Sequence, residues 1–368
     1  MNQRVSKIPH GVRYFFGQEV AHRRDIEQKL LAIFNGWSYQ EIALPIFDYH
    51  ELFALGIGQE AAEQTYRFFD HEGELLALRP DLTSLVARTV ATRFASQHRP
   101  IRLCYSGEVF RYKQVQKYRP HDFHQLGLEH IGNDRLEADV EVIMIVVEVL
   151  NSLGIAGFKL TLSQVDLFNG IADNLELSRE ARKLFRTLLD SRNSEQVEQF
   201  LSKFAPTEEA TQFTALTRIS GKNEIIQAAR KVVTNSKSRA ALEDLEGIID
   251  IAQALNIDQY IDIDLGDVNG LDYYTGMTFK IYVEGVGSAI GSGGRYDNLL
   301  QSFGLSDPAV GFQLSLDWLS QIVAIPEKEP EEVKLLLASD RLSKVFEEAQ
   351  AFRKEQKKLK ITNHLPLE

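Results

Sequence analysis

Cysteine is almost absent from this chain of 368 residues, which contains only Cys104. A single cysteine excludes an intramolecular disulfide and favours a reducing compartment, so we expect a cytoplasmic protein. Cys104 stands between Leu103 and Tyr105. In such surroundings a cysteine usually behaves as a small hydrophobic residue, and we predict that it is buried.

A long apolar run is also missing from the sequence. The longest one, residues 140–150, is interrupted by Glu141 and Glu148 and is too short to span a bilayer. The N-terminus begins with polar and basic residues and lacks the apolar core of a signal peptide. We therefore expect no membrane association.

Positive charge is scarce relative to negative charge. The chain has 41 lysines and arginines against 52 aspartates and glutamates, and its formal net charge is −11. This balance argues against a protein that wraps a polyanion, so we predict that the chain does not bind tRNA. Hydrophobic residues make up 44% and charged residues 25%, which is typical of a globular protein. A chain of this length is expected to form two or three units.

Apolar periodicity predicts runs of antiparallel strands with helices gathered around them. Residues 102–110 and 123–131 are predicted strands that flank a polar loop, 111–122. This arrangement is typical of an α+β fold rather than of a doubly wound parallel sheet. The other predicted strands are 39–46, 75–78, 158–164 and stretches within 262–283, and the predicted helices are 18–36, 82–95, 136–153 and 311–325.

The character of the sequence changes between residues 168 and 254, where charged and alanine-rich helical stretches dominate. We predict a helical insertion subdomain over 168–254, placed within a core that consists of residues 1–167 and 255–325. Residues 326–368 are interpreted as a linker, which is charged and bounded by prolines, and a short C-terminal segment. That segment includes a charged helix predicted over 340–359 and is too short for an independent domain of normal size.

Several short segments carry recognisable motifs. They are Leu78–Thr83, Glu108–Arg111, Phe123–Glu129, Gly270–Tyr274, Gly293–Asp297 and Ala309–Phe312. In this order and spacing they resemble the motifs of the histidyl-tRNA synthetase family, over residues 8–322 apart from the helical insertion. The resemblance implies a class II aminoacyl-tRNA synthetase core, which is an antiparallel sheet flanked by helices.

The resemblance also implies a histidine-binding-like pocket. An amino-acid pocket needs an anion for the α-ammonium group and polar groups for the side chain, because burying either without a partner costs roughly 2–7 kcal/mol. Three residues match the family's ammonium-binding positions, and three more match positions around the imidazole ring. The first three are Asp81, Thr83 and Gln125, and the others are Glu129, Tyr273 and Tyr274.

Several of these residues also have a simpler structural interpretation. Asp81 would suit the N-terminus of a helix, where a negative charge is stabilising. Gln125 and Glu129 would suit a polar strand face, while Tyr273 and Tyr274 would suit ordinary strand packing. The neighbouring motifs favour the pocket for the two tyrosines, and both interpretations stay open for the other three residues.

Positions that contact phosphate in the family are retained in part. Arg111, Arg119 and Arg295 stand where the resemblance implies remnants of a phosphate site. Adenylation needs cations on the ATP phosphates and a fixed positive charge at the transferring group. Whether the chain retains that chemistry depends on three further positions.

These three positions have changed in the direction that removes catalysis. Lys113 replaces an acidic residue on the adenine side, Asn269 replaces the arginine at the reacting centre, and Trp318 replaces the motif 3 arginine. An indole cannot substitute for a guanidinium that pairs with phosphate. Losing one such charge reduces the rate by a factor of about 10²–10³. The alternative interpretation is neutral drift with activity retained.

Histidines near the second predicted strand invite a metal-binding interpretation. His121 and His124 are close in sequence, but no further histidine or cysteine clusters with them at ligand spacing. We therefore predict neither a metal site nor another cofactor.

The lost charges and the short C-terminal segment resemble one paralogous family, the regulatory subunits of ATP phosphoribosyltransferase. This resemblance implies a non-catalytic subunit of a glycosyltransferase complex in the first step of histidine biosynthesis. The implied partners are a short-form catalytic subunit in a hetero-octamer and a second copy of the chain in a synthetase-like dimer, with histidine as a possible effector. The alternative is an active histidyl-tRNA synthetase or another histidine-adenylating enzyme.

Overall fold

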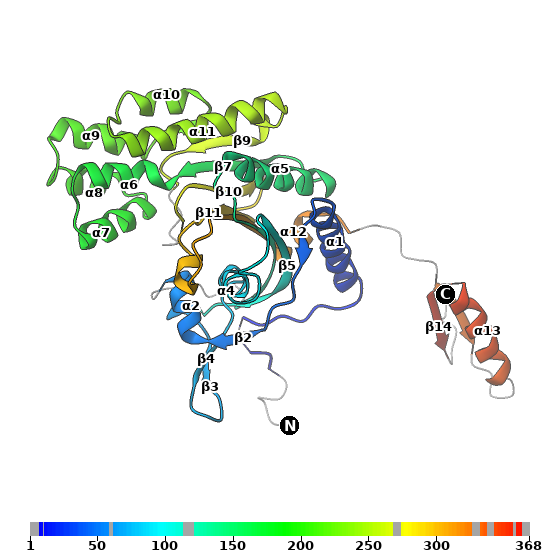
Figure 1. Cartoon of the computed structure of the whole chain (residues 1–368). Helices are drawn as coiled ribbons and strands as arrows, with labels where there is room; N and C mark the ends of the chain where they lie inside the picture. The colour runs from blue at the N-terminus through cyan, green and yellow to red at the C-terminus, as the bar shows by residue number, and fades with distance from the viewer. Residues whose placement is uncertain are drawn as a thin grey trace. The chain divides into compact units, whose positions relative to one another are not determined.

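A mixed β-sheet organises the first of two compact units in the chain, Met1–Val323 (Figure 1). The computed structural model describes residues 7–9, 11–58, 62–112, 121–267, 274–325, 332–336, 342–355 and 358–362. The sheet and the helices on its faces confirm the predicted α+β class.

Nine of the described strands form this sheet, and its six central strands, β5–β6–β12–β11–β10–β7, are antiparallel. Parallel pairs flank them, β1 with β5 and β7 with β9, so the sheet is mixed around the antiparallel centre that the sequence predicts. Each parallel pair is joined by a long crossover, as parallel strands require. The strands are β1 (Gln40–Glu41), β5 (Ile101–Phe110), β6 (Asp122–Ile131), β7 (Phe158–Gln164), β8 (Ser220–Gly221), β9 (Ile261–Asp264), β10 (Met277–Val283), β11 (Gly291–Arg295) and β12 (Ala309–Ser315).

Two long helices cover one face of the sheet. α1 (Gly17–Gly36) and α5 (Leu136–Ser152) bury apolar side chains in the same core cluster as Leu126 and Leu128 of β6. This cluster supplies most of the hydrophobic stabilisation of the sheet, because it excludes the largest apolar surface from water. Even α5, the most apolar of the long helices in the described residues, is not long and apolar enough to cross a membrane.

The helix α4 (Thr83–Arg93) packs against the opposite face of the sheet, in the same core cluster as Leu103 of β5. In Figure 1 the sheet curves around α4. Side chains alternate between the two faces of a strand, so β6 presents Gln125 and Glu129 on the α4 face while its leucines face α1 and α5. The polar residues of the predicted pocket are thereby gathered on the concave side.

The stretch 311–325, predicted as one helix, is a strand followed by a helix. β12 continues to Ser315, and α12 spans Leu316–Ile322. The Ser315 side chain caps α12 by accepting a hydrogen bond of 3.4 Å from the Trp318 backbone N–H. A buried strand carries apolar residues on both faces, so its pattern resembles that of a buried helix.

A small three-stranded sheet leads the chain into α4. Its middle strand, β4, ends at Leu78, just before Arg79 and Asp81. The buried Arg79 donates hydrogen bonds to the carbonyl oxygens of Glu108, at 2.6 Å, and Leu44, at 2.7 Å. These bonds fix the start of α4 against the main sheet. The elements here are β2 (Phe47–Tyr49), α2 (His50–Ile57), β3 (Arg67–Phe69) and β4 (Leu75–Leu78).

Between β7 and β9 the described chain is almost entirely helical. Four of its helices follow a residue whose side chain accepts a backbone N–H: Gln164 before α6, Ser178 before α7, Asn193 before α8 and Asn235 before α11. The helices belong to the first compact unit, and the predicted insertion limits of 168–254 stay a proposal. They are α6 (Val165–Asn174), α7 (Arg179–Asp190), α8 (Ser194–Leu201), α9 (Thr207–Leu216), α10 (Glu224–Arg230) and α11 (Ser236–Ala254).

The second compact unit, Ala324–Glu368, contains two parallel strands and a helix between them in sequence. β13 (Glu332–Leu336) pairs with β14 (Lys358–Thr362), and α13 spans Leu342–Lys354. The helix predicted over 340–359 is therefore too long at its C-terminal end. Alternating polar and apolar residues from Lys358 onward favour a strand instead.

Gly311 of β12 lies opposite Glu129 of β6, where the strands leave no room for a side chain. A Cβ atom at residue 311 would lie 1.8 Å from Glu129 Oε2 and 2.4 Å from the Leu128 carbonyl oxygen. We predict that Gly311→Ala lowers the free energy of unfolding by about 3 kcal/mol, because these buried strands must shift apart. Chemical denaturation measures the change.

The matched control is Gly287→Ala, since a Cβ atom at residue 287 would meet nothing within 4 Å. We expect this variant to unfold at nearly the same denaturant concentration as the unaltered protein. Equal stability of the two alanine variants would contradict the close approach of β6 and β12.

Candidate functional site

A cavity of about 220 Å³ lies on the α4 side of the sheet. The floor comes from β6, β11 and β12, one wall from the start of α4, and another from Tyr274 and Tyr296. Five of the six predicted pocket residues line it, together with Arg111. Its described lining residues are Ile57, Gln64, Pro80, Asp81, Thr83, Arg111, Gln125, Glu129, Tyr274, Ser292, Tyr296, Gly311, Phe312 and Gln313.

Glu129 lies on the cavity floor and is only 1% exposed. Three hydroxyl groups donate hydrogen bonds to its carboxylate. Thr83 Oγ1 and Tyr105 OH donate to Oε1 at 2.9 and 3.0 Å, and Tyr296 OH donates to Oε2. The three donors come from α4, β5 and the segment after β11, so this carboxylate joins three parts of the chain.

Burial raises the pKa of Glu129 from 4.5 to about 7, because the charged form is poorly solvated inside the protein. The three hydroxyl donors oppose this rise by stabilising the anion, while the negative charge of Asp81 adds to it. Near neutral pH the protonated and ionised forms are therefore both populated. A ligand that favours one form changes the proton occupancy when it binds.

Asp81 is the second buried carboxylate of the cavity. The Ser84 backbone N–H and hydroxyl donate to its two oxygens at 3.2 and 3.3 Å, which places Asp81 at the N-terminus of α4. Burial raises the pKa of Asp81, and the positive charge of Arg111 opposes the rise. Both structural interpretations of Asp81 therefore apply, because it contacts the helix start and also lines the cavity.

Gln125 is 2% exposed, yet its side-chain amide has no hydrogen-bond partner among the described residues. Because Gln125 lines the cavity, its amide is available there to a polar ligand. The amide offers such a ligand both a hydrogen-bond donor and an acceptor.

Arg111 is the one arginine among the described residues that line the cavity. Its Nε donates to the Pro80 carbonyl oxygen at 2.8 Å, and its guanidinium lies over the Phe123 ring, 5.1 Å from the centroid. These contacts hold the positive charge near Asp81 at one side of the cavity. With two buried acids and one arginine, the described lining suits a cationic group better than a polyphosphate.

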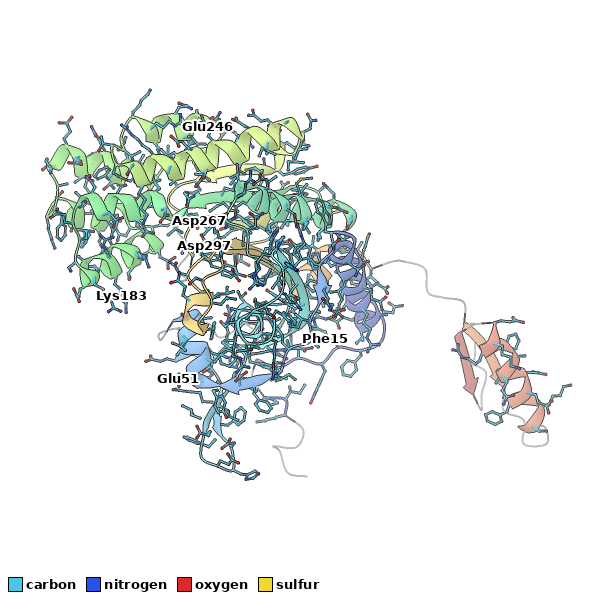
Figure 2. All side chains as sticks on the ribbon, viewed as in Figure 1. Phe15, Glu51, Lys183, Glu246, Asp267 and Asp297 are labelled. Atoms are coloured by element: carbon cyan, nitrogen blue, oxygen red, sulfur yellow. The ribbon has the colours of Figure 1, made fainter. Side chains whose placement is uncertain are left out.

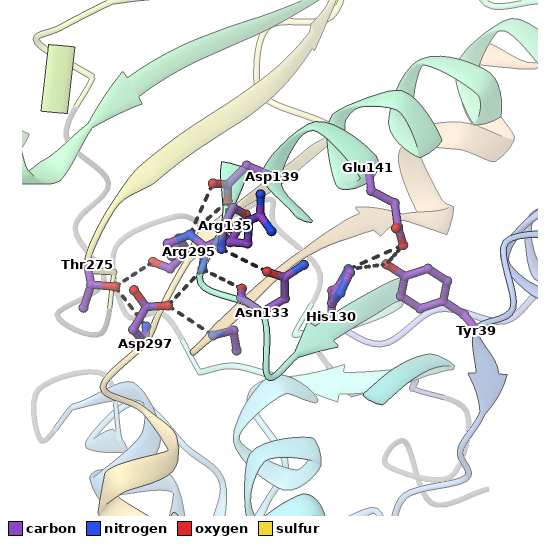
Figure 3. A network of polar contacts seen from close by, with 10 residues as sticks. Tyr39, His130, Asn133, Arg135, Asp139, Glu141, Thr275, Arg295 and Asp297 are labelled. Atoms are coloured by element: carbon purple, nitrogen blue, oxygen red, sulfur yellow. Dashed lines mark hydrogen bonds and ion pairs between the residues drawn. The ribbon is translucent and has the colours of Figure 1, made fainter. Parts of the chain in front are cut away.

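Arg295 lies outside the described cavity lining, and Figure 3 shows it enclosed by polar groups. Its guanidinium pairs with Asp139 at 3.0 Å and with Asp297 at 3.2 Å. It also donates to the carbonyl oxygens of Asn133, at 3.1 Å, and Arg135, at 3.3 Å. This geometry makes Arg295 a link between α5 and β11, and it does not favour the phosphate role, which stays a prediction.

The remaining predicted residues lie in different places. Tyr274 lines the cavity and is nearly buried. Trp318 lies on α12, partly buried against the core that contains α1 and α5, and does not belong to the described lining. Four residues lie outside the described part of the chain: Lys113, Arg119, Asn269 and Tyr273.

Two partners of Glu129 were missed by the sequence interpretation. Tyr296 lies within the Gly293–Asp297 motif, where the preceding arginine drew attention instead. Tyr105 lies on the same face of β5 as Leu103 and is buried, as a core residue would be. The only available signal was the presence of a hydroxyl group on an otherwise apolar strand face, and that signal is weak.

The two histidines considered for metal binding have other contacts. His121 forms a hydrogen bond with the Tyr66 hydroxyl, and His124 lies 2.6 Å from Ser106 Oγ and 3.3 Å from Glu108. The described residues contain no group of three or more histidines, cysteines or acids arranged to hold a metal ion. The expectation of no cofactor stays a prediction.

Comparisons with known proteins agree on one group of relatives. A family model described as histidyl-tRNA synthetase matches residues 11–319. The ATP phosphoribosyltransferase regulatory subunit of Thermoanaerobacter sp. (strain X514) is 37% identical over 311 residues, covering 84% of this chain and 81% of the relative. The protein of the same name from Caldanaerobacter subterraneus subsp. tengcongensis is 35% identical over 353 residues, covering 95% and 92%.

Solved structures give a consistent result. The fold is similar to a protein from Bacillus halodurans described as an ATP phosphoribosyltransferase regulatory subunit/histidyl-tRNA synthetase, with a TM-score of 0.88 and 26% identity over 97% of this chain and 92% of that one. Histidyl-tRNA synthetase from Nostoc sp. PCC 7120 gives a TM-score of 0.80 and 19% identity over 98% and 87% of the two chains. At 19% identity, the similarity to the Nostoc protein shows a shared fold alone.

The raised pKa of Glu129 predicts a characteristic pH dependence of stability. Between pH 4.5 and about 7 the folded protein holds a proton that the unfolded chain has released. The free energy of unfolding therefore falls as the pH rises through this window, by about 2–3 kcal/mol from this group. We predict that Glu129→Gln removes this part of the fall. Between pH 5 and pH 8 the melting temperature of the variant should therefore decrease less than that of the unaltered protein.

Thermal unfolding at several pH values, with Glu74→Gln as an exposed control, measures the effect. The difference between each variant and the unaltered chain reports the substituted residue, which for Glu129 includes its charge interaction with Asp81. Identical pH profiles for Glu129→Gln and the unaltered protein would show that Glu129 is ionised with an ordinary pKa.

Proposed function

The chain belongs to the family of ATP phosphoribosyltransferase regulatory subunits, and we propose that it acts as the non-catalytic, histidine-responsive subunit of such an enzyme. The family resemblance that its motifs indicated is thereby confirmed. In this proposal a separate short-form catalytic subunit transfers the phosphoribosyl group to ATP, which is a glycosyl transfer. The complex would then act in the first step of histidine biosynthesis.

The observation that carries this proposal is the chemistry of the cavity. It presents two buried carboxylates, an amide without a partner and one arginine within a volume of about 220 Å³. Histidine has a group for each of these. Its α-ammonium group suits Asp81, its carboxylate suits Arg111 or the Gln125 amide, and an imidazole N–H suits Glu129.

Catalysis of adenylation is disfavoured by the same lining. The described cavity lining offers one guanidinium, that of Arg111, which contacts the Pro80 carbonyl oxygen and the Phe123 ring. The sequence has Asn269 where the family's reacting centre has an arginine, and Trp318 where motif 3 has one. Without fixed positive charges the transition state of adenylate formation would lack its main stabilising interaction.

Self-association is a second part of the proposal. The small sheet and the residue before it carry five exposed apolar side chains, which we call the aromatic patch: Ile46, Phe47, Tyr49, Phe68 and Phe69. Phe47 and Phe68 contact each other, with ring centroids 5.7 Å apart. Exposed apolar side chains gathered on one small element usually mark an interface.

We propose that a second copy of the chain covers the aromatic patch, giving the synthetase-like dimer. Two such dimers and four catalytic subunits would make up a hetero-octamer. The net charge of −11 supports a protein partner in preference to tRNA.

Reconstitution with a short-form catalytic subunit tests the function. We expect phosphoribosyl transfer to ATP to rise on mixing and to become sensitive to L-histidine.

Asp81→Asn should keep the activation and weaken L-histidine binding about tenfold to hundredfold, because an ion-paired hydrogen bond to the ammonium group is lost. Asp134→Asn, at an exposed aspartate, is the control.

Two outcomes of that experiment would reject the proposal. One is the absence of any stimulation of the catalytic subunit. The other is histidine-dependent exchange of pyrophosphate into ATP by the chain alone, which would identify it as a synthetase or another histidine-adenylating enzyme.

The dimer is tested by placing a charge in the aromatic patch. Phe47 and Phe346 are equally exposed, at 51%, but only Phe47 belongs to the patch. We predict that Phe47→Glu yields monomers in light scattering, because a buried unpaired carboxylate is strongly unfavourable at an interface. Phe346→Glu, in the second unit, should remain dimeric, and dimers of both variants would place the interface elsewhere.

A further inference from the structure

Arg192 joins the helical part of the chain to the strand that precedes the Gly270–Tyr274 motif. It lies in the turn between α7 and α8, with a left-handed φ of 51° that is unfavourable for a residue with a side chain. Its Nη2 lies 2.9 Å from Asp264 Oδ2 and 3.3 Å from Asp267 Oδ1. Asp264 ends β9, and Asp267 is three residues further on.

Asp267 is a buried acid between two cations. It is 5% exposed, and Lys280 of β10 pairs with the same oxygen that faces Arg192. Its second oxygen is buried without a partner among the described residues. A buried carboxylate depends strongly on its cations, since removing one leaves the charge poorly compensated. The position of Asp267 is therefore sensitive to Arg192.

Two further contacts attach the same segment to the helical part. β8 pairs with β9 through Ser220 opposite Asp264 and Gly221 opposite Ile263. Gly266 lies so close to the backbone after α9 that a Cβ atom there would be 2.1 Å from the Thr217 carbonyl oxygen. The segment 261–267 thus has little freedom to move independently of the helices.

Lys280, which pairs with Asp267, connects this segment to the strands beside the cavity. It belongs to β10, which begins three residues after Tyr274 and pairs with β11 through Thr278 opposite Gly294. A Cβ atom at Gly294 would lie 2.8 Å from the Tyr274 ring, so β11 directly supports a wall of the cavity. The contacts run from Arg192 through Asp267 and Lys280 to this wall.

We propose that Arg192 is a positioning residue that couples the helical part to the ligand cavity. Figure 2 labels Asp267 where the helical part meets the sheet. This proposal rests on the proposed function for the ligand, and it adds the route by which binding reaches α7 and α8. Coupling of this kind is reciprocal, so whatever changes the position of these helices also changes affinity in the cavity.

Hydrogen exchange of the unliganded full chain gives the first test. We expect Arg192→Gln to speed exchange of the amides of residues 261–267 about twofold to tenfold, because the segment loses an ion pair with two carboxylates. The control is Arg230→Gln, which removes a comparable ion pair with Glu246 inside the helical part. Unchanged exchange at 261–267 in Arg192→Gln would overturn the proposal, whatever the ligand is.

Titration with L-histidine gives the second test. In the unaltered chain we expect L-histidine to slow amide exchange in α7 and α8 as well as around the cavity. Arg192→Gln should bind L-histidine about threefold to tenfold more weakly and lose the protection of α7 and α8, while Arg192→Lys should retain part of both effects. Unchanged protection of the two helices in Arg192→Gln would also overturn the coupling.

The two tests separate this proposal from the proposed function. If the unaltered chain does not bind L-histidine, the choice of ligand fails, while the exchange result for 261–267 still decides the role of Arg192. If L-histidine binds and Arg230→Gln weakens it as much as Arg192→Gln does, general loosening of the helices replaces the specific coupling.

Discussion

The buried carboxylate of Glu129 is the interaction on which the arrangement of the cavity depends. Its hydrogen-bond donors, Thr83, Tyr105 and Tyr296, come from segments that are far apart in sequence. Each donor gains a charged acceptor only if its segment is correctly placed, so the three bonds reinforce one another. Opposite the carboxylate, β12 must carry a residue without a side chain, which Gly311 provides. Folding of the sheet and formation of the cavity are therefore the same event.

The same carboxylate also determines which ligands the cavity can accept. An acid that is partly protonated near neutral pH can accept a hydrogen bond from one ligand atom or donate one to another. Together with Asp81 it makes the floor of the cavity acidic, which opposes the entry of phosphate groups and favours ammonium and imidazolium groups. The negative charge of the cavity therefore favours an amino acid over a nucleotide, independently of the shape of the cavity.

Much of this fold could be predicted from the sequence, because its central features are local. Strands 102–110 and 123–131 have clear periodicity and flank a polar loop, and the structure places β5 and β6 there. The parallel edges could not be predicted, since they depend on how long crossovers return to the sheet. β12 was mistaken for a helix because it is apolar on both faces, and a short apolar run does not distinguish the two structures.

Residues of the candidate site could be predicted where a short sequence motif identifies them. They could not be predicted where their role depends on a partner that is distant in sequence. Asp81, Thr83, Gln125 and Glu129 were recognised from short motifs and do come together around one cavity. Arg295 was assigned to phosphate because its motif is arginine-containing, whereas its main partner, Asp139, lies 156 positions away. No local pattern reveals that pairing.

The contacts of Arg295 have a consequence for how such a protein can change over evolutionary time. The arginine that ties α5 to β11 lies outside the described cavity lining, so it maintains the scaffold without facing a ligand, unlike Glu129 and Gly311. Substitutions at other lining positions can then accumulate one at a time while the chain still folds. A lineage can exchange one chemistry for another on this scaffold without passing through unfolded intermediates.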